Sequence, residues 1–239
     1  MKKHILLMTL IAGLFASAWS LSIYDIQYTT SPGSDNTYPS LYAGKSVSTE
    51  GIVTAVDYKS GGFFISEAVA GPYSGLLVMD RRSDVQVGDR VRLSGLVLES
   101  FGMTTLQNIT SLVILERNHP LPRPITLTTA QLSHAVEAEA YEGVYTRILS
   151  VSSTGKKSSA NRLMVSDGTG VCSVLLGNFG SANSRSAGST VTQFSSITGL
   201  VTFSFGEFSL NPVSNSDIET NQPVSVQSRS WGKIKSIYK

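Results

Sequence analysis

Residues 95–106 decide the fold, because their sequence, GLVLESFGMTTL, recurs 104 residues later at 199–210 as GLVTFSFGEFSL. Seven of the twelve positions are identical, and the alignment needs no gap. Upstream the match is looser but keeps its order, pairing 47–56 with 144–151, 63–67 with 163–167, and 76–79 with 174–176. Similarity at a fixed spacing indicates two copies of one structural unit. The sequence therefore predicts two tandem modules.

Each copy consists of short strands separated by glycine turns. In the first copy we expect strands at 46–57, 63–66, 76–79, 90–98, 103–108 and 112–115. Gly88 supplies the positive φ for a turn at 84–89. Five or six strands in about 70 residues predict a small β barrel or sandwich. The only helices expected are one at 129–138, with Thr128 or Thr129 as N-cap, and one at the C-terminus.

The chain divides into five predicted segments. Residues 1–18 have a basic start, an apolar run at 5–15 and small residues at 16–18, which is typical of a secretory signal peptide. The alternative, an uncleaved anchor, is disfavoured because the apolar run is shorter than the ~20 residues that span a bilayer. Module 1 then occupies 19–116, a proline-rich linker 117–124, module 2 125–216, and a polar tail with an aromatic and basic end 217–239. We expect a secreted, periplasmic or cell-envelope protein without a transmembrane segment.

Charge argues against a non-specific clamp for nucleic acid. The 19 Lys and Arg residues exceed the 17 Asp and Glu residues only by the two lysines at positions 2 and 3. Residues 19–118 carry seven basic and ten acidic side chains, and residues 119–216 carry six and five. Proteins that bind phosphate backbones normally carry a basic excess. Only a local cluster of arginines could therefore recognise an anion.

No catalytic constellation stands out in the sequence. Cys172 lies in an alternating stretch, so a small buried strand residue is favoured over a nucleophile or a dimer crosslink. The carboxylates Glu137, Glu139 and Glu142 could serve acid/base or metal chemistry, but a solvated acidic face is the favoured interpretation. We therefore predict no enzyme activity, no cofactor and no metal site.

Several motifs resemble a known family. They are GKSVSTEGIVT at 44–54, GFFI at 62–65, VGDRVRLSG at 87–95, LQN at 106–108, PITL at 124–127 and YEGV at 141–144. Together they are similar to the OB-fold-like modules that precede the catalytic domain in secreted bacterial nucleases of the endonuclease/exonuclease/phosphatase superfamily. The resemblance covers roughly residues 23–216 and implies an all-β chain of two tandem OB-like five-stranded barrels.

The chain departs from this family after the second module. Only 23 residues follow Ser216, and the segment SDI at 216–218 lacks the histidine of the Ser-Asp-His motif of the family. A metal-dependent phosphodiesterase needs ligands distributed over a full domain. We therefore expect the modules without the nuclease activity.

OB folds bind oligonucleotides or oligosaccharides on the face of strands 2 and 3. Exposed aromatic and basic residues near that face are the candidate binding residues. Because successive side chains of a strand alternate, one of Phe63 and Phe64 is expected to point outward. The full candidate set is Tyr58, Lys59, Phe63, Arg81, Arg82, Lys156, Lys157, Arg162 and Phe205.

The leading prediction is a secreted, non-catalytic OB-fold adaptor for single-stranded nucleic acid or polysaccharide, working beside a separate hydrolase or an envelope protein. Two alternatives stay open. One is an envelope or matrix protein whose barrels mediate protein contacts, and the other is an accessory part of an extracellular nuclease.

Overall fold

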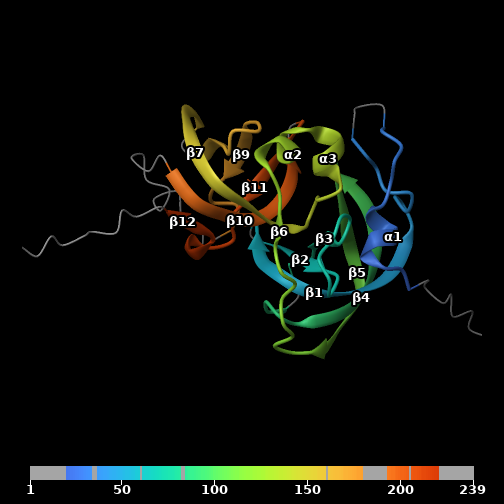
Figure 1. Ribbon diagram of the computed structural model, residues 1–239. Coiled ribbons are helices and arrows are strands. Elements are labelled where there is room, and N and C mark those ends of the chain that lie inside the picture. The colour runs from blue at the N-terminus through green and yellow to red at the C-terminus, as the bar shows by residue number, and fades with distance from the viewer. Residues whose placement is uncertain are drawn as a thin grey trace, which may run out of the picture.

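The computed structural model describes residues 20–33, 37–59, 61–81, 84–159, 161–179, 193–204 and 206–220, without the side chains of 156–159. The predicted signal peptide and most of the predicted tail lie outside these ranges. Within them, no helix is long and apolar enough to span a membrane. The chain forms two closed barrels of five strands each (Figure 1), which confirms the predicted all-β architecture.

The first barrel has the strand order β1-β2-β3-β5-β4 and closes through pairing of β1 with β4. All neighbouring strands are antiparallel except β3 and β5, which pair in parallel. The strands are β1 (Ser46–Tyr58), β2 (Gly62–Ser66), β3 (Gly75–Met79), β4 (Arg90–Ser100) and β5 (Met103–Glu116).

The second barrel repeats this order as β7-β8-β9-β11-β10, again closed by its first and fourth strands. A short β6 pairs with β7, and β12 pairs with β10. The sheet therefore continues to Thr220, beyond residue 216 where the predicted module ended. The strands are β6 (Ile125–Thr126), β7 (Tyr145–Ser159), β8 (Arg162–Ser166), β9 (Cys172–Leu175), β10 (Gln193–Ser204), β11 (Glu207–Asn211) and β12 (Ile218–Thr220), with a 3-10 turn at Asn215–Asp217.

The sequence repeat is also a repeat of strand register. Val97 pairs with Leu106 in the β4–β5 hairpin, and Val201 pairs with Leu210 at the equivalent place in β10–β11. The tight turn of the first hairpin places Phe101 at φ 55° and Gly102 at φ 85°. This turn requires two positive φ values, which explains why a glycine recurs at both hairpins.

β5 is one continuous strand, although the sequence predicted two. Ser94 pairs with Ser111 and Leu96 with Gln107, so the residues between them on β5 form a bulge opposite Gly95. Asn108 in this bulge has φ 49°. A bulge interrupts the alternation of side chains without ending the strand. This interruption is why the sequence predicted two strands here.

A short helix precedes the first strand of each barrel. These are α1 (Ile23–Gln27), which the sequence did not predict, and α2 (Thr129–Ser133), which is followed by α3 (Ala135–Glu139). Both α1 and α2 begin with a capping box, and Thr128 is confirmed as the N-cap of α2. The predicted helix at 129–138 is divided at His134, whose backbone is extended.

Each of these helices is tied to the end of the second strand of its barrel. The backbone NH of Tyr24 donates to the Glu67 carboxylate at 3.1 Å, and that of Thr129 donates to Asp167 at 3.0 Å. Glu67 and Asp167 occupy equivalent positions in the repeat. The duplicated unit therefore includes the helix as well as the barrel.

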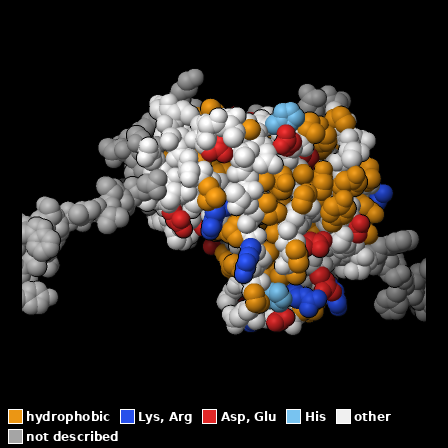
Figure 2. All heavy atoms as spheres, in the orientation of Figure 1, with side chains coloured by type: hydrophobic (Ala, Val, Ile, Leu, Met, Phe, Trp, Pro, Cys, Tyr) orange, Lys and Arg blue, Asp and Glu red, His pale blue; other side chains and the backbone are white. Residues whose placement is uncertain are grey.

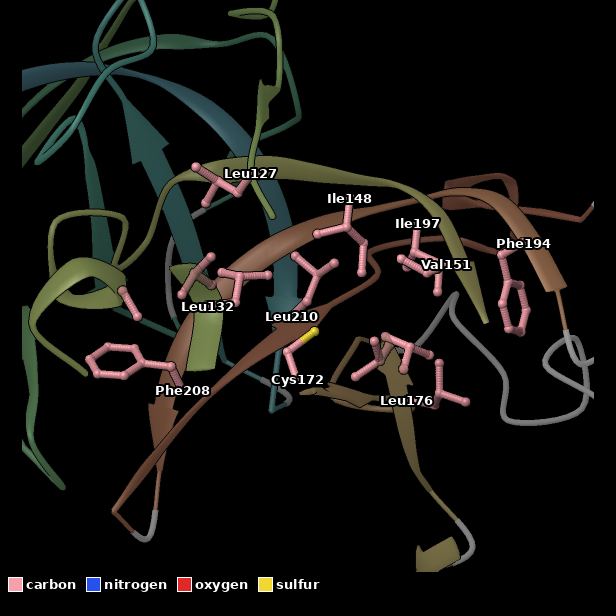
Figure 3. Close-up of a cluster of buried hydrophobic side chains, with 14 residues drawn as sticks. Leu127, Leu132, Ile148, Val151, Cys172, Leu176, Phe194, Ile197, Phe208 and Leu210 are labelled. Carbon is pink, nitrogen blue, oxygen red and sulfur yellow. The ribbon is translucent and has the colours of Figure 1, made fainter. Parts of the chain in front are cut away.

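Each barrel has its own hydrophobic core, and a third cluster lies between them. Figure 3 shows the core of the second barrel, with Cys172 among leucine, isoleucine and phenylalanine side chains. Cys172 is 2% exposed on β9, so the prediction of a small buried strand residue is confirmed.

Candidate functional site

The surface on which an OB barrel would hold its ligand is largely an interface in this protein. Outward-facing residues of β1, β2 and β3 pack against the second barrel in the third hydrophobic cluster, called the seam here. Tyr58, Phe64 and Phe179 meet there, with ring centroids 5.2 to 6.1 Å apart. Phe179 follows β9 of the second barrel. The seam residues are Ala55, Tyr58, Phe64, Leu77, Met103, Phe179 and Leu200.

Two predicted aromatic binding residues are therefore buried. Tyr58 is 2% exposed in the seam, and Phe63 is 3% exposed in the core of the first barrel. Phe64 does point out of the first barrel, as alternation predicted for one of the pair, but the prediction of Phe63 as an exposed binding residue is wrong. The two side chains do alternate, but the second barrel covers the outer one. Neither ring offers an open face for stacking on a ligand.

Lys59 and Arg81 line one groove beside the β1–β2 turn, which we call the turn groove. It encloses about 680 Å³ and is bordered by Asn178 from the second barrel. The stem of Arg81 lies against Gly61, since a Cβ there would be 2.4 Å from Arg81 Cγ. Asp57, Asp80 and Asp84 line the same groove, so carboxylates outnumber the cations of its described part.

Lys59 also lines a second groove, the seam groove, of about 450 Å³. Its walls come from both barrels and combine apolar surface with hydroxyl and amide groups. Gln107 donates from Nε2 to Ser100 Oγ at 2.7 Å and to Thr105 Oγ1 at 2.9 Å along one wall. The lining residues are Tyr58, Lys59, Leu77, Met79, Ser100, Phe101, Met103, Thr105, Gln107, Phe203 and Ser204.

Phe101 is the most exposed aromatic residue among those described, at 90%, and it lies at the tip of the β4–β5 turn. The ring of Phe203, from β10, packs under this turn, because a Cβ on Gly102 would lie 2.4 Å from Phe203 Cε1. The predicted candidate set contains neither Phe101 nor Phe203. The available signal was the repeat, which places Phe101 at the same turn position as the predicted Phe205.

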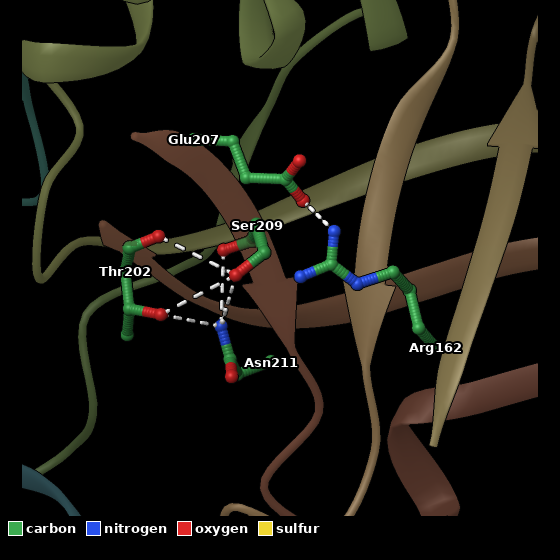
Figure 4. A network of polar contacts seen from close by, with 5 residues as sticks. All are labelled: Arg162, Thr202, Glu207, Ser209 and Asn211. Carbon is green, nitrogen blue, oxygen red and sulfur yellow. Dashed lines mark hydrogen bonds and ion pairs between the residues drawn. The ribbon is translucent and has the colours of Figure 1, made fainter. Parts of the chain in front are cut away.

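In the second barrel, the side chain of Arg162, a predicted binding residue, forms an ion pair with another residue of the chain. Its guanidinium forms an ion pair with Glu207 on β11 (Figure 4). Lys156 and Lys157 lie on β7, but their side chains are outside the described part, as are Arg82 and Phe205. The described members of the predicted set therefore do not form one site. Lys59, Phe63 and Arg81 line the turn groove, and Tyr58 and Lys59 line the seam groove; of these residues, Lys59 and Arg81 are the exposed ones.

Beside this ion pair, a buried network of hydrogen bonds joins β10, β11 and the loop before Phe179 in the second barrel. Asn211 donates from Nδ2 to Thr202 Oγ1 at 2.8 Å and to the Ser209 carbonyl at 3.0 Å (Figure 4). Its Oδ1 accepts from Asn178 Nδ2 at 2.6 Å. Thr202, Ser209 and Asn211 are at most 1% exposed. Because buried polar groups must be satisfied, this network favours one arrangement of the 177–179 loop against β10 and β11.

Three buried groups, the thiol of Cys172 and the carboxyl groups of Glu139 and Glu142, are not among the lining residues of either groove. Burial raises the pKa of the Cys172 thiol to about 12, which removes its nucleophilic thiolate. Glu139 and Glu142 are 6% and 2% exposed, so the predicted solvated acidic face is wrong for these two residues. The segment after α3 meets the first barrel here, where the Tyr73 NH donates to the Ala140 carbonyl and the Thr104 NH donates to the Glu142 carboxyl group. The described residues contain no group of His, Cys, Asp or Glu arranged to hold a metal ion.

No family model matches the chain, and no curated protein matches it. The fold and the grooves define the class: a two-barrel, OB-like protein with a hydrophobic cluster between the barrels and two grooves that share Lys59.

Proposed function

We propose that the chain is a secreted, non-catalytic adaptor that binds a segment of an extracellular polysaccharide in the seam groove. The carrying observation is the composition of this groove: an apolar floor, the exposed Phe101 ring at its edge, and Ser100, Thr105 and Gln107 along one wall. Sites with hydrophobic and aromatic lining and a few placed polar groups are typical of small organic ligands. Sugar rings present both an apolar face and hydroxyl groups, which match this lining.

The location of the groove also supports a ligand of this kind. It lies between the β1–β2 and β4–β5 turns of the first barrel, the loops through which OB folds contact oligonucleotides and oligosaccharides. Lys59 is its only cationic lining residue among those described, and the adjoining turn groove carries an excess of carboxylates. A phosphate backbone would meet too little positive charge here, so a neutral polymer is favoured over nucleic acid.

The test is a binding screen of the mature chain against a glycan panel, with single-stranded DNA and RNA oligonucleotides in parallel. Phe101→Asn should weaken glycan binding by about tenfold, corresponding to ~1.4 kcal/mol. Asparagine tolerates the positive φ of Phe101, so the turn is retained. The matched control is Val69→Ala, which removes apolar surface from a residue that is 82% exposed and outside both grooves.

Other outcomes would redirect the proposal. Retention on single-stranded DNA that disappears at moderate salt and in Arg81→Ala would favour a nucleic-acid adaptor, with the turn groove as its site. Metal-dependent DNA cleavage by the purified chain would instead favour the nuclease-associated alternative. Equal glycan binding by Phe101→Asn and Val69→Ala would remove the seam groove as the site.

One observation favours a second candidate, an envelope or matrix protein that acts through protein contacts. Tyr24 and Tyr28 stack at 5.2 Å, and both meet the edge of Tyr73. Tyr24 and Tyr28 are 44% and 41% exposed, and Figure 2 shows hydrophobic side chains gathered over the half of the molecule that carries α1. Tyrosine clusters are common in protein interfaces. Cosedimentation with isolated envelopes that is lost in Tyr28→Ala would support this function.

A further inference from the structure

Three glutamates from both barrels converge beside the seam. Glu99 lies near the end of β4, Glu139 ends α3, and Glu142 precedes β7. Glu142 is 2% exposed and Glu139 is 6% exposed. The Oε2 atoms of Glu99 and Glu142 are buried and have no hydrogen-bond partner among the described residues. Such orphaned oxygens are uncommon in folded proteins, because each carries a desolvation cost.

One residue of the first barrel holds two of these carboxyl groups. The backbone NH of Thr104 donates to Glu142 Oε1, and the Thr104 hydroxyl donates to Glu99 Oε1, both at 2.9 Å. The backbone NH of Ser40 also donates to Glu99 Oε1, at 2.9 Å. The contact between Glu142 and Thr104 joins the barrels directly, since Glu142 precedes the first strand of the second barrel and Thr104 lies on β5.

No cation offsets the charge of this cluster within the described residues, where none of the ion pairs includes Glu99, Glu139 or Glu142. Within the cluster, the three glutamates face one another. Outside it, Tyr73 lies next to Glu139, and Tyr24, Tyr28 and Tyr38 lie next to Tyr73. All of these are acids. Burial of a carboxylate without a cation is strongly disfavoured. A protonated carboxyl group is neutral, and its OH can donate a hydrogen bond to a neighbouring oxygen.

We propose that the cluster of Glu99, Glu139 and Glu142 is a proton-dependent latch between the two barrels. With Glu139 and Glu142 protonated, Glu142 stays against Thr104 and the seam is closed. When these two carboxyl groups ionise, their mutual repulsion and the cost of keeping their charges away from water favour separation of the second barrel from β4 and β5. The seam groove is built from both barrels, so its width follows the state of the latch.

The direction of the pH response follows from the environment of these groups. Burial and the Glu99 carboxyl raise the pKa of Glu139 to about 8. Burial and Glu139 raise the pKa of Glu142 well above its usual value, and the Thr104 NH opposes this only in part. Between about pH 4.5 and 8 the unfolded chain binds fewer protons at Glu139 than the folded chain does. Stability therefore decreases with rising pH across this window.

The experiment compares the full mature chain at pH 5.5 and pH 9.5 by its thermal unfolding midpoint and its radius of gyration from X-ray scattering. Glu142→Gln retains an acceptor for the Thr104 NH and cannot ionise. Glu116→Gln, an exposed residue at the end of β5, is the matched control. Glu139→Gln is the second variant and gives the same readout if Glu142→Gln fails to fold.

At pH 9.5 we expect wild type and Glu116→Gln to unfold at least about 5 °C lower than at pH 5.5 and to have a larger radius of gyration. Glu142→Gln or Glu139→Gln should lose most of both changes. The proposal is overturned if wild type has the same midpoint and radius at both pH values, or if the two variants respond as strongly as the control. A Ca²⁺-dependent reversal of the change at pH 9.5 would also overturn it, because the occupant would then be a metal ion.

Discussion

Gly75, at the start of β3, lies directly against Gly143, which precedes β7: a Cβ on Gly75 would be 2.1 Å from the Gly143 carbonyl oxygen. This is a contact between the backbones of the two barrels. Gln27 strengthens it from α1 by donating its Nε2 to the Gly75 carbonyl at 2.6 Å. The two barrels are therefore fitted to each other at the level of the main chain as well as through the side chains of the seam.

Gly75→Ala should open this contact, because the methyl group has no space unless the barrels move apart. We expect a loss of about 1–3 kcal/mol in the free energy of unfolding, measured by urea denaturation. Gly71→Ala is the control, since a Cβ there would have no atom within 4 Å. Equal stability of the two variants would show that the barrels do not depend on this approach.

Phe179→Ala should destabilise the whole molecule, although Phe179 lies in a loop after β9. The ring is 2% exposed and packs on Tyr58 and Phe64 of the first barrel. Its removal leaves a cavity in the seam, with an expected cost of about 3–5 kcal/mol in chemical denaturation. Phe101→Asn, which removes an exposed ring, should change stability by no more than ~0.5 kcal/mol. A small effect for Phe179→Ala would mean that the seam is not a shared core.

Asp167→Asn should reduce the acid sensitivity of the protein. Burial opposes ionisation of Asp167, but hydrogen bonds from Thr129 and Thr169 outweigh it and hold the pKa well below its usual value of 3.8. Stability from this group is present above about pH 3.8 and is lost as the pH falls through the lower folded-state pKa. Urea unfolding at pH 5 and pH 3 should show a smaller drop for Asp167→Asn than for wild type or for the exposed-site control Asp84→Asn. An unchanged drop would contradict this role.

The ion pair between Arg162 and Glu207 should contribute little to stability and nothing to glycan binding. Its side chains are 24% and 44% exposed, so water screens the interaction. A double-mutant cycle with Arg162→Ala and Glu207→Ala should give a coupling energy below ~1 kcal/mol. Both variants should bind glycans as wild type does, because neither residue lines the seam groove. Loss of glycan binding in Arg162→Ala would indicate that the binding site lies on the second barrel.

Local sequence predicted those parts of the fold that depend on neighbouring residues. The repeat at 95–106 and 199–210 corresponds to two hairpins of identical register, because turn residues and alternation act within a few positions. The N-cap Thr128 was also predictable from its own segment. The bulge at Asn108 and the short helix α1 were missed, since one breaks the alternation and the other is only five residues long.

The candidate site was harder to predict, and the reason is visible at Phe64 and Glu142. Alternation correctly indicated that Phe63 and Phe64 face opposite sides of β2, and an acidic run such as 137–142 is ordinarily solvated. Instead, the second barrel covers Phe64, and the first barrel covers Glu142. In both cases the covering residues are far away in the chain. Burial of this kind depends on the packing of whole modules, and no local pattern reports it.

The sequence by itself determined the duplicated all-β unit and the positions of most strands of the first barrel, because strand periodicity, glycine turns and helix caps are local properties. Only the tertiary structure decided that the two barrels share a core. That arrangement buries Tyr58 and Phe64, builds the seam groove from β5 and β10, and encloses Glu142 beside Thr104. The physical reason is that desolvation and steric fit between modules arise from long-range contacts, which the order of residues along one strand does not contain.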